Sequence, residues 1–366
     1  MNNQTLTSTG SYMLFKVAAV FFIIGGMQSA SPILNPFFLA IFIAIICWQP
    51  LLWLRQHEYF KNYSKTLLIS IIMAGVFIIM TFLMIIIGTS INDFIDEIPR
   101  YQLQFDERQQ SILTWAGNHG VNIHSDSFLT ELFDPTKALQ FAANVLGEFG
   151  NVLTDMVLIL LTVIFLLLEA FILPLKFEKA FDNNHLLERS EIILHAIKQY
   201  LKIKTQTSLV TGIAITLWLM FLDVDYAVLW GISAFLLNFI PSIGQVISAI
   251  PPVCLILLQS GFSGALLVIA GFIAIHTVID NIWEPKLMGR GLGLSLLTIF
   301  LSLVFWGWVF GPVGMLLSVP FTIIVKITLE NYESTQWIAI FLSSEDDFKT
   351  NDTENNAVQH NLKTAQ

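Results

Sequence analysis

Three ionisable side chains recur at helical spacing in the stretch HTVIDNIWEP. His276, Asp280 and Glu284 are four residues apart, so on an α-helix they share one face, and Asn281 adds an amide beside them. Because histidine titrates near neutral pH, His276 beside Asp280 could carry a coupled proton. Pro285 is expected to end this helix. The pattern favours an ion or proton site, although acidic residues also collect at membrane helix ends simply because they reach water there.

A second polar set interrupts an apolar run. Residues 226–279 contain no Asp, Glu, Lys or Arg, yet residues 238–252 read NFIPSIGQVISAIPP, with prolines and a glycine expected to break the helix. Such a break exposes backbone N–H and C=O groups, which a bilayer tolerates only inside protein or beside a wet cavity. The free N–H groups of the following half-helix attract oxygen atoms. The break predicts a binding position for a small polar solute; the alternative is a kink whose polar side chains satisfy the loosened backbone.

A similar break occurs further on, at Gly311–Gly314 in the apolar run 294–325. Each half of that run has about 15 residues, or about 22 Å of helix, which is short for crossing a bilayer. Two hydrophobic segments interrupted at mid-length are typical of transporter binding sites, and we expect both to be re-entrant hairpins. The residues predicted to line the solute pathway are Asn238, Pro241, Ser242, Gly244, Gln245, Asn281, Gly311 and Gly314, and those predicted for ion or proton coupling are His276, Asp280 and Glu284.

The elements that must position these residues are membrane helices. Of 366 residues, 55% are hydrophobic and 12% are charged, and the mean hydropathy is +0.70. A span needs about 20 apolar residues, and runs such as 67–87, 156–173 and 294–325 meet or approach that length. The sequence therefore predicts an all-α polytopic membrane protein with about eight membrane segments, some of them broken or re-entrant in the C-terminal half.

The basic residues give the expected topology. They gather near residues 55–65 and 176–204, and short basic loops lie in the cytoplasm, so both termini are expected inside. The predicted organisation is N-terminal membrane helices at 1–90, an extramembrane amphipathic segment at 91–151, transport-core helices at 152–342, and a disordered cytoplasmic tail at 343–366. Re-entrant hairpins would also place Lys286 and Arg290 in the cytoplasm.

Signatures of catalysis were sought and are missing. The sequence has no GxxxxGK[ST], HExxH or GxSxG motif and no cysteine-rich metal site; its two cysteines, Cys47 and Cys254, lie far apart in apolar segments. We therefore expect no enzyme activity, cofactor or metal. The net charge of −9 comes from loops and tail, so no nucleic-acid partner is expected.

Three stretches together resemble the AI-2E transporter family, also called PerM-like permeases. They are NFIPSIGQVISAIPP, DNIWEPKLMGRGLGLS and FWGWVFGPVGMLLSVP, in this order and spacing. The resemblance implies a multi-spanning bacterial inner-membrane protein that exports a small polar solute such as autoinducer-2, with Na⁺/H⁺ exchange as an alternative. A membrane scaffold without a transported solute is the competing class. The expected partners are the solute, the bilayer and further copies of the chain in a homo-oligomer.

Overall fold

The described part of the chain is helical and divides into two compact units. The computed structural model describes residues 15, 18–57, 63–118, 155–173, 176, 184–288, 293–332 and 334–344. Unit 1 comprises Met1–Trp48, Val157–Leu194 and Gly293–Gln366, and unit 2 comprises Gln49–Met156 and His195–Leu292. Within the described residues the only β pairing is a single bridge between Leu294 and Ser343.

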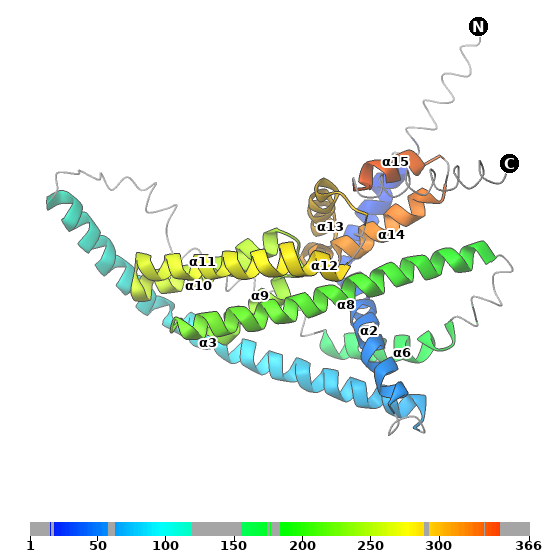
Figure 1. Cartoon of the computed structure of the whole chain (residues 1–366), viewed down its shortest axis with the longest axis horizontal. Helices are drawn as coiled ribbons and strands as arrows, with labels where there is room; N and C mark the ends of the chain where they lie inside the picture. The colour runs from blue at the N-terminus through cyan, green and yellow to red at the C-terminus, as the bar shows by residue number, and fades with distance from the viewer. Residues whose placement is uncertain are drawn as a thin grey trace, which may run out of the picture. The chain divides into compact units, whose positions relative to one another are not determined.

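Twelve labelled helical elements follow one another along the chain (Figure 1). They are α2 (Ser31–Gln56), α3 (Lys65–Asn118), α6 (Met156–Ala170), α8 (Asn184–Phe221), α9 (Ala227–Leu237), α10 (Ile243–Ser260), α11 (Phe262–Val278), the π-helical turn η1 (Ile279–Trp283), α12 (Glu284–Met288), α13 (Leu296–Leu316), α14 (Ser318–Glu330) and α15 (Gln336–Leu342).

Several of these helices are long and apolar enough to cross a bilayer. Among the described residues there are four: Ser31–Gln56, Thr66–Ser90, Phe262–Leu287 and Leu296–Leu316. Shorter apolar helices cover Ala18–Ser29, Met156–Ala170, Ala227–Leu237 and Ile243–Leu257. Large apolar side chains such as Ile78 and Phe82 of α3 are exposed, as expected where lipid is the solvent. The prediction of an all-α polytopic membrane protein with broken helices in the C-terminal half is confirmed.

The third predicted span does not stop at the membrane boundary drawn from the sequence. α3 continues from Lys65 to Asn118 and so includes the first half of the segment predicted to be extramembrane. The polar residues after 90 change the character of this helix without ending it, and Pro99 lies inside it, where a proline removes one backbone hydrogen bond but need not stop the helix. The remainder of that segment, from 119, lies outside the described residues as far as 154.

Unit 2 has a core built where α9, α10 and α11 meet α3 and the C-terminal part of α8. Figure 1 shows α10 and α11 side by side, and the two helices are in contact along their length. The fully buried centre of this core consists of Ile215, Leu219, Leu229, Trp230, Leu255 and Val268. This packing fixes the position of α10 against α11, the two helices that carry the candidate site.

Pro251 and Pro252, which the sequence analysis expected to break the chain, lie inside α10. A proline within a helix removes one backbone hydrogen bond and can bend the helix without ending it. The expectation of a break at these two positions is therefore wrong. The break occurs upstream, between Leu237 and Ile243.

In unit 1 the C-terminal residues of the described chain hold the start of α13. The carbonyl of Gly293 accepts from Lys326 Nζ at 2.7 Å and from the Ser344 N–H at 3.1 Å. The Ser295 N–H donates to the Leu342 carbonyl at 3.0 Å. Of the tail predicted at 343–366, the first two residues are thus part of the folded unit, and the rest lies outside the described residues.

Candidate functional site

The first break is a tight turn between α9 and α10. The Ile243 N–H donates to the Pro241 carbonyl at 2.6 Å, and the residue between them, Ser242, has φ 60° and ψ −49°. This is a γ-turn of the rarer, strained hand. Strained backbone of this kind persists only where the surroundings hold it, and it clusters at functional sites.

Gly244, which follows this turn, allows two backbones to approach closely. A Cβ atom at this position would lie 1.8 Å from the Leu237 carbonyl oxygen and 3.3 Å from the Ile240 Cβ. Because the obstacle is backbone, it cannot rotate away as a side chain would. The position therefore requires glycine, and the start of α10 is held against the end of α9.

The polar side chains around the break take different directions. Asn238 is buried and donates through Nδ2 to the hydroxyl of Ser208 on α8 at 3.0 Å. Ser242 is exposed. Gln245 reaches α11 and η1, so it is the side chain that connects the break to the ionisable residues.

We call Gln245, His276 and Asp280 the polar centre. Gln245 Nε2 donates to Asp280 Oδ2 at 2.6 Å, and His276 Nδ1 lies 2.8 Å from the same oxygen. The side chains of His276 and Asp280 are only 9% and 11% exposed. Among the described residues, the other carboxylate oxygen, Asp280 Oδ1, and the other ring nitrogen, His276 Nε2, have no hydrogen-bond partner although both are buried. Buried polar atoms normally have partners, so these two are free to bind a ligand or water.

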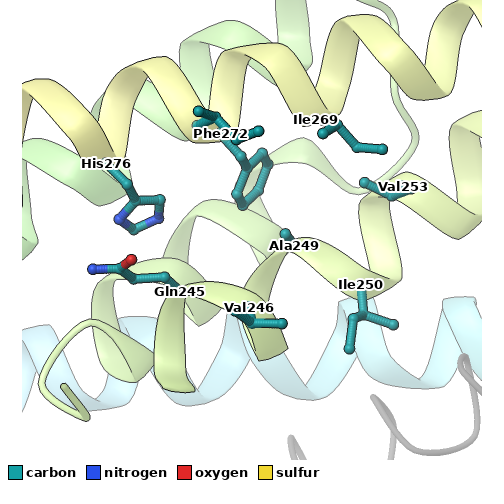
Figure 2. A pocket seen from close by; sticks show the side chains of 9 residues that line it. Gln245, Val246, Ala249, Ile250, Val253, Ile269, Phe272 and His276 are labelled. Atoms are coloured by element: carbon teal, nitrogen blue, oxygen red, sulfur yellow. The ribbon is translucent and has the colours of Figure 1, made fainter. Parts of the chain in front are cut away.

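A cavity of about 350 Å³ adjoins the polar centre (Figure 2). Gln245 and His276 stand at one end of it, and Phe272 lies alongside. The remaining walls are apolar and come from α10 and α11: Val246, Ala249, Ile250, Val253, Ile269 and Ile273. The volume is at the lower end of the range for small-molecule pockets, and one polar end with apolar walls is their usual composition.

Glu284 does not join the polar centre. The Glu284 N–H donates to the Ile279 carbonyl five residues back, so Ile279–Trp283 forms a π-helical turn between Asp280 and Glu284. The π-turn changes the helical register between the two residues, and the hydrogen bonds of the Glu284 side chain go to α8 and not to the polar centre. The coupling role predicted for Glu284 stays a prediction. Pro285 does not end the helix either: α12 continues to Met288. Since proline has no N–H to donate, the wide turn before it accommodates the missing bond.

Glu284 instead forms a buried ion pair with α8. Lys204 Nζ lies 3.0 Å and 3.2 Å from the two carboxylate oxygens, and the Thr207 hydroxyl donates to one of them at 3.0 Å. Lys204 is 5% exposed and Thr207 is fully buried. The sequence analysis placed Lys204 in a cytoplasmic basic stretch. The signal it missed is the polar spacing of Lys204, Thr207, Ser208 and Thr211, which is that of one helix face.

The second break lies in unit 1. Gly311 has φ 63° and ψ −145°, outside the helical region, and Pro312 follows it inside α13. Pro312 has no N–H for the carbonyl of Trp308, four residues back, and Gln28 Nε2 donates to that oxygen at 3.3 Å. Asn35 of α2 donates to the Phe310 carbonyl at 3.2 Å. Two amide side chains that the sequence analysis did not single out therefore satisfy the backbone that this break exposes.

The two breaks have the same local construction. A Cβ at Gly314 would lie 1.9 Å from the Trp306 carbonyl oxygen, as one at Gly244 would meet Leu237. Four residues after each glycine, a buried serine donates to the carbonyl three residues back: Ser248 to Gln245 at 2.9 Å and Ser318 to Met315 at 2.8 Å. The two breaks thus share the close approach of a glycine to an earlier carbonyl and a buried serine four residues later, although their backbone turns differ.

Comparisons with known proteins identify the family of this chain. The family model for the AI-2E family transporter matches residues 12–334. The chain belongs to the AI-2E transporter family. It is similar to the AI-2 transport protein TqsA of Escherichia coli (strain K12), with 39% identity over 94% of this chain and 98% of that protein. A Haemophilus influenzae protein named as a candidate transport protein is 37% identical over 95% of this chain and 99% of its own length. The Escherichia coli protein YhhT, named in the same way, is 34% identical over 91% and 95%.

Family membership settles the class of protein. An AI-2E transporter moves a small solute through a lipid bilayer, and the apolar helices together with the bacterial relatives indicate the inner membrane. The resemblance drawn from the three sequence stretches is confirmed, and so is the assignment to secondary transport.

Of the residues predicted for the site of this AI-2E transporter, the structure brings Gln245, His276 and Asp280 together. Asn281 is exposed on η1. Pro241, Ser242 and Gly244 form the first break, next to the polar centre in sequence, while Gly311 and Gly314 form the second break in unit 1. Their roles in the solute pathway remain predictions.

Proposed function

We propose that this AI-2E transporter exports a small, uncharged polar solute, that autoinducer-2 is one, and that the polar centre binds it. The observation that carries the proposal is a cavity beside a broken helix whose polar end is formed by Gln245 and His276, both of which contact Asp280 Oδ2. Within the described residues, His276 Nε2 and Asp280 Oδ1 are buried without hydrogen-bond partners. The relative TqsA is named as an AI-2 transport protein, which supports the choice of cargo.

The chemistry of the cavity suits a small hydroxylated ring. Asp280 Oδ1 would accept a hydrogen bond from a solute hydroxyl, and His276 Nε2 would donate or accept according to its tautomer. The C–H faces of the ring would lie against Phe272 and Ile273. A solute with a net negative charge is disfavoured, because the Asp280 carboxylate contacts both polar residues that line the cavity.

Flux measurements in proteoliposomes test this proposal. Wild-type protein should release autoinducer-2 faster than protein-free vesicles do, and Asp280→Asn and His276→Gln should each slow release by roughly tenfold, since hydrogen bonds to a charged group contribute about 1.5–3 kcal/mol. Gln206→Leu, a change on the exposed face of α8, is the control. Folded wild-type protein without flux for autoinducer-2 or related small polyols would end the proposal.

We also propose that transport is coupled to protons at His276 and Asp280. The supporting observation is their buried 2.8 Å contact, because a proton can pass between a histidine and a carboxylate that are hydrogen-bonded to each other. Glu284 was predicted for this role as well. Because its carboxylate is paired with Lys204, we leave it out of the proposed proton path. Flux should follow an imposed pH gradient in the wild type and lose that dependence in His276→Gln and Asp280→Asn. Flux that ignores the gradient in the wild type would identify a facilitator.

The remaining expectations stay proposals. Both termini are placed in the cytoplasm by the basic loops, and export is taken as the direction of transport. The comparisons favour neither Na⁺/H⁺ exchange nor a scaffold role, since the named relatives are transport proteins. A homo-oligomer is proposed for the assembled state, and native mass spectrometry of the purified protein would measure its copy number.

A further inference from the structure

A buried ion pair sits at the far end of the turn that carries Asp280. Lys204 contacts both carboxylate oxygens of Glu284, at 3.0 Å and 3.2 Å, and Thr207 donates to one of these at 3.0 Å. The side chains of Lys204 and Glu284 are 7% and 15% exposed. Removing two charges from water costs much of what their attraction returns, so a buried pair is weak evidence for a stabilising role. Fixing one arrangement of neighbouring elements is the better-attested use of such pairs.

The arrangement that this ion pair would fix is the π-helical turn η1, Ile279–Trp283. This turn separates Asp280, which is bonded to Gln245 of α10, from Glu284, which is bonded to α8. A π-turn inserts one residue into the helix, and it is less favourable than the regular turn it replaces. Were the segment to return to a regular helix, the register of Glu284 relative to Asp280 would change and the Glu284 carboxylate would move relative to α8. Lys204 and Thr207 would then lose their partner, so the two ends of the turn constrain each other.

We infer that Lys204 is a positioning residue for transport: through Glu284 it holds the π-turn that directs Asp280 at Gln245 and His276. This inference rests on the proposed function of the polar centre. Glu284 serves here as a fixed anion. It neither carries the transported proton nor contacts the solute.

Charge exchange tests the positioning role. Lys204→Met and Glu284→Gln each leave one buried charge without its partner, and each should lower the initial rate of autoinducer-2 release by roughly tenfold or more. The exchanged double variant Lys204→Glu/Glu284→Lys restores opposite charges and should recover the rate to within about threefold of the wild type. Lys202→Met changes an exposed lysine of the same helix and is the matched control.

A second measurement does not depend on transport. Hydrogen–deuterium exchange, read by mass spectrometry, should become faster in residues 279–284 of Lys204→Met. It should return to the wild-type rate in the charge-swapped variant Lys204→Glu/Glu284→Lys. Exchange in α13 and α14 should stay unchanged, which distinguishes local release of the turn from general unfolding. Faster hydrogen exchange together with slower transport in Lys204→Met, both reversed in the charge-swapped variant, would support the inference.

Three results would overturn it. One is a charge-swapped variant, Lys204→Glu/Glu284→Lys, whose residues 279–284 exchange hydrogen at the wild-type rate but which does not transport. That result would make the carboxylate at 284 itself necessary for transport. Another is a Lys204→Met protein with loosened residues 279–284 and normal flux, which would make the pair purely structural. The last is a wild type without flux, which ends the proposed function and this inference with it, while the exchange data still report whether the pair holds the turn.

Discussion

Replacing Gly244 by alanine should damage both the fold and transport. The new Cβ would lie 1.8 Å from the Leu237 carbonyl oxygen, while ordinary contact begins at 3.4 Å, so α9 and α10 must separate by more than about 1 Å. Overpacking of this kind costs about 1–3 kcal/mol, and alanine in a helix returns about 0.5–1 kcal/mol relative to glycine. The net loss of stability should therefore be between about 0 and 2.5 kcal/mol.

The same displacement acts on Gln245, the next residue. Its 2.6 Å hydrogen bond to Asp280 does not survive a shift of that size, and a hydrogen bond to a charged group contributes about 1.5–3 kcal/mol, which corresponds to roughly a tenfold or greater loss of flux. The assays are thermal unfolding in detergent and autoinducer-2 release from proteoliposomes. Gly75→Ala in α3 is the control, because a Cβ there meets nothing within 4 Å. If Gly244→Ala unfolds and transports like Gly75→Ala, the close approach across the first break is wrong.

Three further predictions concern the second break, the polar centre and the topology. Gly311→Ala should lower the unfolding temperature although a Cβ there meets nothing within 4 Å, because a backbone with φ 63° and ψ −145° costs an L-residue about 1–3 kcal/mol. An unchanged melting curve would contradict this. Gln245→Leu should reduce autoinducer-2 flux by roughly tenfold, while its unfolding temperature stays close to that of the wild type. Equal losses of flux in Gln245→Leu and in the control Gln206→Leu would argue against a specific role of Gln245. Lys286→Cys should react with a membrane-impermeant thiol reagent only from the cytoplasmic side, and labelling from outside would refute the re-entrant hairpins.

The sequence alone predicted the helical architecture and the first break well. Long apolar runs indicate membrane helices whatever their partners are, because the requirement comes from the thickness of the bilayer. Pro241 and Gly244 mark the break because proline and glycine act on their own backbone. The spacing of His276 and Asp280 was also sufficient, since an ordinary helical turn joins them.

The features that the sequence did not predict depend on contacts between distant segments of the chain. The ion pair of Lys204 with Glu284 joins residues 80 positions apart, and no local pattern identifies a partner at that distance. The π-turn could not be predicted because four-residue spacing assumes a regular helix. Pro251 and Pro252 were misjudged for a related reason: whether a proline ends a helix or bends it depends on the packing around it, and here α10 is held between α9 and α11.

The most direct test of the central claim is an experimental structure with autoinducer-2 bound. The proposed function predicts the solute between α10 and α11, with a hydroxyl within hydrogen-bond distance of Asp280 Oδ1 and the ring against Phe272. It also predicts that Gln245 and His276 keep their contacts with Asp280 Oδ2. A solute bound elsewhere, with Asp280 Oδ1 and His276 Nε2 contacting only water, would contradict the assignment of the polar centre as the binding site.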